Sequence, residues 1–467
     1  MSTAVVTERP QEAGHLERLE LLCDPGSLEL IRTGVVSPRM GERARPDDGV
    51  LVGGGRVDGR PVFCYAQDPS YLGGSLGAVH ADSIVRVMEL ARRRGAPVVG
   101  FVESGGARLQ EGHDALAGYG RIFRASVELS RVAPQITVVS GVAAGGGAYS
   151  PALTDFVVMT GAGRMFLTGP RIVRAALGEE VTMEDLGGPG VHERNGVAHF
   201  IVESEPEAAA LARDLLGLLS QGGGDPPPPS DRNVAPHGAA PTVPSDPRKV
   251  YDVREVARTL LDGGELLEES PRWAANMVTG LGRIEGQPVA VVANQPRVLA
   301  GVIDAAGAEK AARFVEKCNR FRLPLIVLVD TPGFMPGLRE EAAGVIRRGA
   351  GLLHAFAGAT VPKLTVVLRK AYGGAVITMN SRDLGADAVF AWPGAEIGIM
   401  AARQAVDIVH RKRLAEGDGD PELLASAYAE EHLGADAAAA TGFVDEVIDP
   451  DSTRHHLARA LAWRGEP

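Results

Sequence analysis

Four glycine-bearing turns carry the residues best suited to chemistry in this sequence. They read ESGGARLQEG (103–112), SGVAAGGGAYSPA (140–152), DTPGFMPG (330–337) and RKAYGGAVITM (369–379). A strand that ends in glycine and opens a helix leaves backbone N–H groups unpaired at a positive helix terminus. Glycine lets the backbone approach a ligand with no Cβ in the way. Two such turns side by side can therefore bind one oxyanion.

The four turns form two pairs, because the chain repeats itself. The offset in residue number from Gly106 to Gly333 equals the offset from Pro97 to Pro324, where each proline stands before an aliphatic run. The offset from Gly146 to Gly374 is larger by a single position. An offset so nearly constant predicts two copies of one fold, and each copy presents an equivalent pair of turns.

Short aliphatic runs alternate with Ala-rich helical stretches in both halves of the chain. The runs are PVVGFVE (97–103), ITVVSGV (136–142), LPLIVLVD (323–330) and KLTVVL (363–368). Continuous apolar runs of this length are typical of strands that are buried on both faces. The alternation predicts an α/β fold in which each of these strands ends at a glycine turn.

A Pro- and Gly-rich stretch separates the two halves. It contains four consecutive prolines from Pro226 to Pro229 and few apolar residues, a composition that favours extended polyproline geometry. We therefore expect an N-terminal domain over 1–220, a linker over 221–248 and a C-terminal domain over 249–467.

Composition narrows the class of protein. The net charge of −11 argues against a nucleic-acid binder, which needs a basic face to neutralise phosphates. The three cysteines, Cys23, Cys64 and Cys318, fit neither a disulfide framework nor a zinc ribbon, so we expect no metal in this chain. No apolar run reaches the ~18 residues that span a bilayer. We expect a soluble, cytoplasmic protein that does not bind a membrane.

The turns and their surroundings resemble the carboxyltransferase (β) subunits of biotin-dependent acyl-CoA carboxylases, and most of all the propionyl-CoA carboxylase β chains. The resemblance extends from about residue 15 to about residue 460. The matching stretches include LLCDPGSLEL (21–30), DPSYLGGSLG (68–77), GGGAYSPALTDF (145–156), VANQPRVLAG (292–301), VPKLTVVLRKAYGGA (361–375), AWPGAEIGIM (391–400) and AVDIVHRKRL (405–414). The resemblance implies two tandem crotonase-like (ClpP/crotonase) ββα-superhelix domains that arose by internal duplication.

The resemblance also implies the chemistry. A carboxyl group moves from N1-carboxybiotin, carried on a partner protein, to the α-carbon of a short acyl-CoA through an enolate. Two oxyanions develop, on the thioester and on the biotin ureido group, and a duplicated fold supplies two oxyanion holes. The residues implied for the first hole are Gly106, Ala107, Gly145 and Gly146. Those implied for the second are Gly333, Phe334, Gly373, Gly374 and Ala375.

Residues beside the turns are candidates for substrate binding. They are Ser104, Gly105, Arg108, Tyr149, Val376 and Ile377, of which Arg108 could pair with CoA phosphates, as could the pair Arg369-Lys370. Val376 and Ile377 would give the acyl site an apolar wall that suits acetyl- or propionyl-CoA. No side-chain base is required, since biotin itself can accept the α-proton, and we expect His113 to be structural or exposed.

The family pattern implies partners as well. We expect a biotin carboxylase/biotin carboxyl carrier (α) subunit and a homo-hexamer in which each site lies between the N-half of one subunit and the C-half of another. Biotin is not attached to this chain, which has no Met-Lys-Met. The sequence does not decide which hole binds the thioester, although the family suggests that the N-half does. It also leaves open a biotin-linked 2-carboxyacyl-CoA decarboxylase or transcarboxylase.

Two readings from other classes compete with this one. Gly73-Gly74-Ser75-Leu76-Gly77 fits the G-x-S-x-G nucleophile elbow of a serine hydrolase. However, Asp68-Pro69 interrupts the preceding apolar run, and the repeat places Val302 where Ser75 stands. A non-catalytic scaffold is the other alternative, because glycine turns can also serve tight packing alone.

Overall fold

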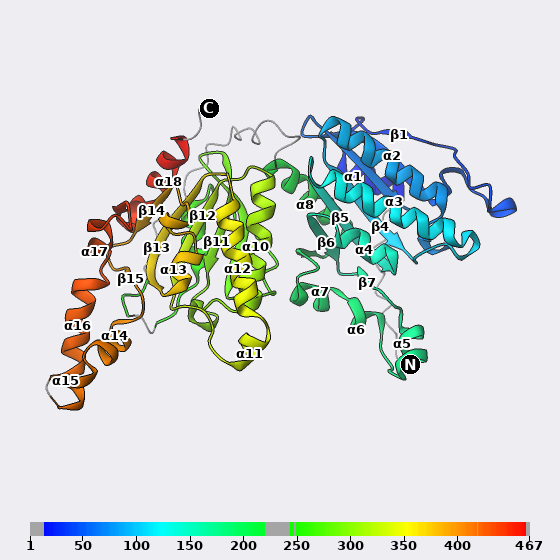
Figure 1. Cartoon of the computed structure of the whole chain (residues 1–467). Coiled ribbons are helices and arrows are strands. Elements are labelled where there is room, and N and C mark those ends of the chain that lie inside the picture. The colour runs from blue at the N-terminus through cyan, green and yellow to red at the C-terminus, as the bar shows by residue number, and fades with distance from the viewer. Residues whose placement is uncertain (1–13, 220–242, 247–248, 418, 464–467) are drawn as a thin grey trace, which may run out of the picture. The chain divides into compact units, whose positions relative to one another are not determined.

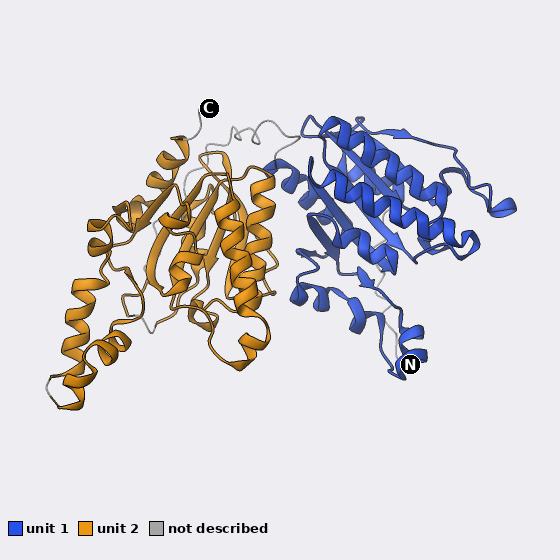
Figure 2. Cartoon of the chain, viewed as in Figure 1, with its two compact units in different colours: residues 1–225 blue, residues 226–467 orange. Residues whose placement is uncertain are grey.

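The computed structural model describes residues 14–219, 243–246, 249–417 and 419–463. The chain divides into two compact units, unit 1 (Met1–Asp225) and unit 2 (Pro226–Pro467) (Figure 2). Of the predicted linker over 221–248, only residues 243–246 belong to the described part, so the remainder of that prediction lies outside it.

Within its described residues, unit 1 contains one eight-stranded sheet with the order β1-β2-β3-β4-β5-β6-β8, and β7 pairs with β5 (Figure 1). The pairs β1–β2 and β2–β3 are antiparallel, and all the others are parallel. The strands are β1 (Glu29–Ile31), β2 (Val50–Val57), β3 (Arg60–Gln67), β4 (Val98–Ser104), β5 (Gln135–Ala144), β6 (Phe156–Thr160), β7 (Arg164–Phe166) and β8 (Phe200–Val202).

Unit 2 repeats this topology strand for strand. Its described residues form an eight-stranded sheet with the order β16-β14-β13-β12-β11-β10-β9, in which β15 pairs with β13. The strands are β9 (Leu267–Glu269), β10 (Met277–Ile284), β11 (Gln287–Asn294), β12 (Leu325–Thr331), β13 (Lys363–Tyr372), β14 (Ala388–Ala391), β15 (Glu396–Gly398) and β16 (Glu446–Val447). The predicted α/β fold is therefore confirmed, and the four predicted strands correspond to β4, β5, β12 and β13.

Helices follow most of the parallel strands. In unit 1 they are α1 (His15–Leu22), α2 (Ala78–Arg94), α3 (His113–Leu129), α4 (Gly146–Ala152), α5 (Pro170–Leu177), α6 (Met183–Gly187), α7 (Pro189–Asn195) and α8 (Glu205–Leu218). In unit 2 they are α9 (Val253–Leu260), α10 (Ala305–Arg320), α11 (Leu338–Ala342), α12 (Val345–Gly358), α13 (Gly374–Thr378), α14 (Ala402–Val409), α15 (Arg411–Ala415), α16 (Pro421–His432), α17 (Ala435–Ala440) and α18 (Thr453–Ala462).

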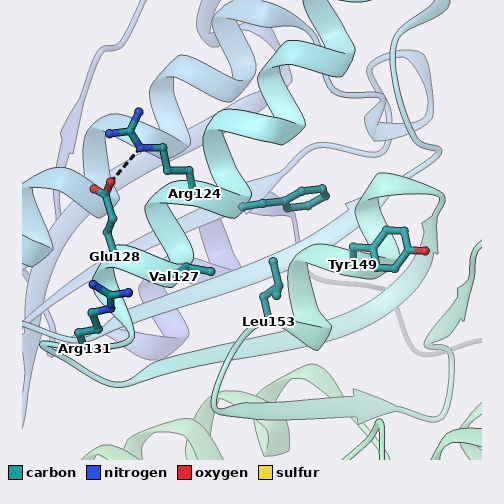
Figure 3. A pocket seen from close by; sticks show the side chains of 7 residues that line it. Arg124, Val127, Glu128, Arg131, Tyr149 and Leu153 are labelled. Carbon is teal, nitrogen blue, oxygen red and sulfur yellow. Dashed lines mark hydrogen bonds and ion pairs between the residues drawn. The ribbon is translucent and has the colours of Figure 1, made fainter.

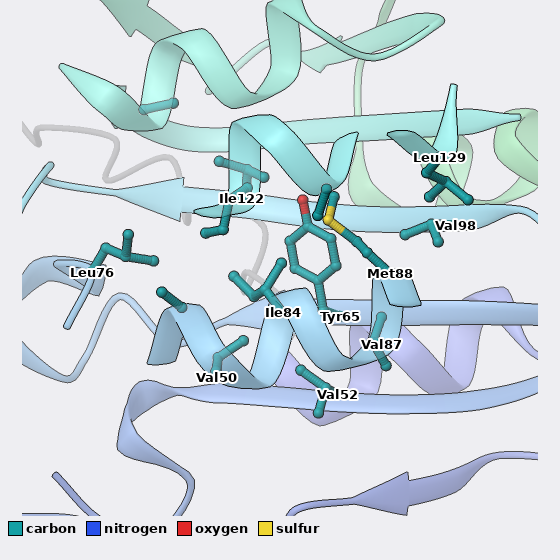
Figure 4. Packing of buried hydrophobic residues seen from close by; sticks show 14 of the residues in the cluster. Val50, Val52, Tyr65, Leu76, Ile84, Val87, Met88, Val98, Ile122 and Leu129 are labelled. Atoms are coloured by element: carbon teal, nitrogen blue, oxygen red, sulfur yellow. The ribbon is translucent and has the colours of Figure 1, made fainter. Parts of the chain in front are cut away.

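The core of unit 1 lies between its sheet and the helices α2 and α3. Figure 4 shows side chains from both layers meeting there, among them Val52, Ile84, Val87 and Ile122, all at most 2% exposed. The helix α2 ends where Gly95 adopts a left-handed conformation (φ 65°), after three arginines that complement the helix dipole. This packing fixes the strand ends from which the glycine turns emerge. None of the described helices is long and apolar enough to cross a membrane.

Candidate functional site

The ends of β4 and β5 bring the first pair of turns together. The two strands run parallel with Ser104 opposite Ala143, after an irregularity between Val102 and Ser104. Gly106 has a φ of 100°, a conformation that favours glycine, and a Cβ on it would lie 3.5 Å from the carbonyl oxygen of Ala144. The turn after β4 therefore packs beside the turn that opens α4.

A short parallel bridge decides which N–H of the β4 turn faces outward. Leu76 donates its N–H to Gly106 O (2.9 Å), and Arg108 donates its N–H to Leu76 O (2.9 Å). Ala107 lies between these two bonds, so its own N–H points away from Leu76. Gly105 donates to Gly73 O (2.8 Å) and Gly106 donates to Ser104 Oγ (3.3 Å). Within the described residues, the Ala107 N–H has no acceptor.

The start of α4 supplies a free donor from the second turn of unit 1. Gly145 donates its N–H to Phe166 O (3.1 Å), and its φ of 57° turns the chain into the helix. Gly146 is the first residue of α4, where an N–H has no partner inside the helix. No acceptor is found for it among the residues described. Ala107 and Gly146 thus each contribute a free donor to this turn pair.

Unit 2 builds the same arrangement from equivalent residues. Ile303 donates to Gly333 O (3.0 Å) and accepts from the N–H of Met335 (2.8 Å), which turns the Phe334 N–H outward. Gly373 donates to Gly398 O (2.9 Å), and Gly374 begins α13. Over the described part of the chain, the N–H groups of Phe334 and Gly374 likewise have no acceptor.

The predicted hole residues thus divide into two roles. Gly106, Gly145, Gly333 and Gly373 all have a positive φ and shape the turns. The N–H groups of Ala107, Gly146, Phe334 and Gly374 are available to a ligand. Ala375, also predicted, is fully buried as the second residue of α13.

Arg108 does not occupy the position that we predicted for a ligand of CoA phosphates. Its guanidinium is fully buried and contacts Asp48 Oδ1 (2.6 Å) and Glu111 Oε1 (2.8 Å). It also donates to the backbone oxygens of Asp48 (3.1 Å) and Ser75 (3.0 Å). Because burial costs an unpaired charge far more than a paired one, this side chain anchors the turn and is not available to a phosphate.

Arg369 requires the same correction. It is 5% exposed, its Nε lies 3.1 Å from Asp330 Oδ2, and its Nη1 donates to the carbonyl oxygens of Pro244, Asp246 and Lys249. Lys370 lies 3.9 Å from the same carboxylate, on Oδ1. The two cations hold the chain around the end of β12.

The other predicted substrate-binding residues differ in exposure. Ser104 is buried and Gly105 is exposed. Tyr149 is 52% exposed on α4 and lines an open hollow of about 720 Å³ with Phe123, Val127 and Leu153 (Figure 3). In α13, Val376 is 9% exposed and Ile377 is 47% exposed, so only Ile377 presents its side chain to a ligand.

Two residues that the sequence offers as possible catalytic side chains, His113 and Ser75, do not stand in catalytic arrangements in the structure. His113 is exposed at the start of α3. Ser75 follows a 3-10 turn (Leu72–Gly74) and not a strand, so no nucleophile elbow forms around it. His80, the histidine nearest to it in sequence, instead contacts Gln67 Nε2 (3.1 Å) and Asp48 O (3.2 Å).

Sequence reasoning missed the side chains that support the first pair of turns. Asp48 and Glu111 neutralise Arg108, and Glu111 Oε2 also accepts the N–H of Ala78 (2.8 Å), the first residue of α2. Burial raises the pKa of Asp48, and the Arg108 guanidinium opposes that rise. The i,i+3 spacing of Arg108 and Glu111 was a usable signal for their ion pair, whereas nothing local links either to Asp48.

Comparison with known proteins places these turns in a family. A family model described as a carboxyl transferase domain matches residues 12–465. The methylmalonyl-CoA carboxyltransferase 12S subunit of Propionibacterium freudenreichii subsp. shermanii is 44% identical over 459 residues, covering 95% of this chain and 87% of that protein. The propionyl-CoA carboxylase beta chain of Roseobacter denitrificans is 43% identical over 459 residues, covering 96% and 89%.

The fold agrees with a solved relative. A transcarboxylase 12S crystal structure, described as a hexamer assembly with methylmalonyl-CoA and methylmalonic acid bound, superposes with a TM-score of 0.91 at 43% identity, over 97% of this chain and 89% of that one. The expected tandem crotonase-like architecture is thereby confirmed. With its family model spanning nearly the whole sequence, the chain belongs to the carboxyl transferase family.

Proposed function

We propose that this chain is the carboxyltransferase component of a biotin-dependent acyl-CoA carboxylase, and that it transfers the carboxyl group to the α-carbon of acetyl- or propionyl-CoA. The observation that supports this most directly is the repetition of two free N–H donors in each unit. The reaction develops two oxyanions, and preorganised backbone donors are the most effective way to stabilise such charges.

In this proposal the pair Ala107 and Gly146 binds the enolate oxygen of the thioester. The pair Phe334 and Gly374 binds the ureido oxygen of biotin, which a partner carrier delivers. Carboxybiotin, when bound, supplies the CO2 and the base that takes the α-proton. The unit 2 turns leave room for the ureido ring, because a Cβ placed on Gly333 or Gly374 would meet no atom within 4 Å.

The partners follow from the same chemistry. We propose a biotin carboxylase/biotin carboxyl carrier (α) subunit and a homo-hexamer, the assembly named for the 12S structure. All three cysteines, Cys23, Cys64 and Cys318, are free and buried, which suits a reducing cytoplasm. Sedimentation of the isolated chain tests the assembly, and an active monomer would contradict it.

A biotin-linked decarboxylase or transcarboxylase is the second candidate function, and the names of two relatives favour it. The methylmalonyl-CoA decarboxylase subunit alpha of Veillonella parvula is 43% identical over 456 residues, covering 96% of this chain and 89% of that protein. The same donor pairs serve both directions by microscopic reversibility. Incubating the chain and unloaded biotin carrier with methylmalonyl-CoA, and assaying carboxylation of the carrier, tests whether the chain catalyses the reverse transfer.

Deleting one donor tests the proposed function. Gly374→Pro removes the N–H at the first position of α13, where proline is well tolerated. The preceding Gly373 has a φ of 61° and a ψ of −148°, which lies outside the α region that a following proline disfavours. We expect kcat to fall about 10²–10³-fold. Gly374→Ala is the matched control, because it keeps the N–H and places its methyl group in open space.

The control decides what a loss means. A large loss in Gly374→Pro with a small loss in Gly374→Ala, at unchanged oligomer size, supports donation by this N–H. Full turnover in Gly374→Pro would contradict the two-pair model, whereas equal losses in both variants would assign the loss to the added side chain and not to the missing N–H.

A further inference from the structure

Tyr119 lies directly behind the first pair of turns. It stands on α3, is 5% exposed and belongs to the core of unit 1. Its hydroxyl lies 3.2 Å from Ser104 Oγ, and the two share a hydrogen bond. Ser104 Oγ also accepts the N–H of Gly106 (3.3 Å), so the phenol is linked through one hydroxyl to the turn that carries Ala107.

The ring of the same residue supports the other turn. A Cβ on Gly146 would lie 2.7 Å from the Tyr119 ring, and one on Gly147 would lie 3.4 Å from its hydroxyl. The backbone of α4 therefore rests on the ring where only glycine fits. One side chain thus contacts both turns, with its hydroxyl toward the β4 turn and its face toward α4.

We propose that Tyr119 is a positioning residue that sets the distance between the Ala107 and Gly146 N–H groups. This inference rests on the proposed function, in which those groups bind the thioester oxyanion. Oxyanion binding needs both donors to converge on one point, and a misplacement of about 1 Å can cost 10²-fold in rate. Tyr119 reaches no reacting atom in this proposal and acts only through the turns.

The protonation state of Tyr119 agrees with this role. Burial raises the pKa of Tyr119 to about 12, although the hydrogen bond shared with Ser104 opposes the rise. The phenol therefore stays neutral at physiological pH and keeps its hydroxyl hydrogen bond.

The described residues of unit 2 show no equivalent contact. The offset that relates Gly106 to Gly333 places Ile346 where Tyr119 stands, and Ile346 is 74% exposed. Thr331, the counterpart of Ser104, accepts the Gly333 N–H on its own Oγ1 (3.2 Å). A Cβ on Gly374 would meet nothing within 4 Å. Removing the Tyr119 contact should consequently impair only the reaction step that uses unit 1.

The test compares two reactions of one variant. Tyr119→Phe keeps the ring under α4 and removes the hydroxyl, while Ser104 Oγ still accepts the Gly106 N–H, so the fold should survive. We expect kcat for acyl-CoA carboxylation to fall about five- to tenfold with KM nearly unchanged. Decarboxylation of the carboxylated biotin carrier without acyl-CoA uses the unit 2 pair and should keep its rate.

A matched variant and a double mutant complete the experiment. Tyr65→Phe makes the same change at another buried tyrosine of this core, which is 3% exposed, and should leave kcat unchanged. Ser104→Ala combined with Tyr119→Phe should be no slower than Ser104→Ala alone, because both changes break one shared contact.

The possible outcomes separate this inference from the proposed function. Wild-type kcat in Tyr119→Phe, equal losses in both reactions, equal losses in Tyr65→Phe, or additive losses in the double mutant would each overturn the positioning role. If Gly374→Pro still loses turnover in those cases, the proposed function survives. If Gly374→Pro is fully active, the proposed function fails whatever Tyr119→Phe does.

Discussion

Unit 1 and unit 2 present equivalent pairs of free N–H groups, yet they hold the turn after the first strand in different ways. In unit 1, Arg108 follows the donor Ala107 and anchors the turn through buried contacts to Asp48 and Glu111. Its counterpart in unit 2 is Met335, which follows the donor Phe334 and carries no charge. The duplicated fold therefore keeps the donors and varies what stands behind them.

The two units also differ in what packs against the second turn, the one that opens α4 in unit 1 and α13 in unit 2. The start of α4 packs on the Tyr119 ring, whereas the start of α13 faces open space at Gly374. Unit 1 is thus the more tightly constrained site. A small thioester oxygen that must be stabilised as charge develops benefits from such constraint. A carrier-bound ring that must enter and leave benefits from an open turn.

Some supports are nevertheless shared, and they show what both units require. Glu340 Oε2 accepts the N–H of Ala305 at the start of α10 (3.0 Å), as Glu111 does for Ala78 at the start of α2 (2.8 Å). Asp330 and its counterpart in the repeat, Glu103, stand just before the turns, and each pairs with an arginine. An acidic side chain at the start of the preceding helix and a neutralised strand end are common to both copies.

The largest expected difference between the units comes from the buried ion pairs. Arg108→Met gives unit 1 the residue that unit 2 carries at this position. It leaves the Asp48 and Glu111 carboxylates, both at most 1% exposed, without their cation. We expect the free energy of unfolding to fall by about 3–5 kcal/mol. Urea denaturation at pH 7.5 measures it.

Met335→Leu is the matched control in unit 2. A volume-conserving apolar exchange should cost less than about 1.5 kcal/mol. If Arg108→Met were as stable as Met335→Leu, the anchoring role of Arg108 would be wrong.

The fold and the location of the turns were predictable, because the repeat offset and the apolar runs mark both copies of each strand. Which N–H faces a ligand was not, since that depends on the bridges Leu76–Ala107 and Ile303–Phe334. The role of Arg108 was also hidden. Its partner Asp48 lies far away in the sequence, in an irregular turn with a φ of 50°, where no periodic pattern exists.

The surroundings of Gly146 and Gly374 also could not be predicted from the sequence. Gly146 and Gly374 look equivalent in the repeat, so a bulky substitution at either would be expected to block the oxyanion in the same way. The structure shows that a Cβ at Gly146 would instead collide with Tyr119. A substitution there disturbs packing, and only Gly374 offers a clean test of the donor.

A smaller difference between the units should appear on acidification. His80 of unit 1 is fully buried, and its counterpart in the repeat is Gly307, which cannot titrate. Burial, aided by the Arg108 charge, lowers the pKa of His80 from 6.5 to about 3. Between these pH values the unfolded chain binds more protons than the folded one, so stability falls as pH falls.

The titration of His80 should therefore lower the free energy of unfolding by about 2 kcal/mol when the pH falls from 7.5 to 5. His80→Gln removes this titration and should flatten the pH dependence by that amount. Denaturation of both proteins at the two pH values measures the difference. The same slope in His80→Gln and in the parent would show that this histidine does not titrate as described.

The smallest expected effect concerns the side chains one helical turn beyond the free donors. Tyr149 on α4 and Ile377 on α13 occupy equivalent positions in the repeat, and they are 52% and 47% exposed. Their neighbours Ala148 and Val376 are 7% and 9% exposed, so the exposed pair is what a ligand would meet. An apolar Ile377 suits a short alkyl acyl chain and has no group to recognise a polar one. One methylene in such a pocket is worth about 1–3 kcal/mol, so specificity among acetyl-, propionyl- and butyryl-CoA should be graded.

Ile377→Asp should therefore change the ranking of these three substrates by about tenfold in kcat/KM while carrier decarboxylation without acyl-CoA persists. Because Ile377 is half exposed, the substitution buries no charge within this chain and should change unfolding free energy little. Tyr149→Phe is the matched change in unit 1, and it keeps the ring that lines the hollow beside α4. If Ile377 lines the acyl site, the ratio of propionyl- to acetyl-CoA moves in Ile377→Asp more than in Tyr149→Phe. If Ile377→Asp instead lowered kcat/KM equally for all three substrates and left the ratio unchanged, Ile377 would have a packing role only. Residues of unit 1 would then set the acyl-chain specificity.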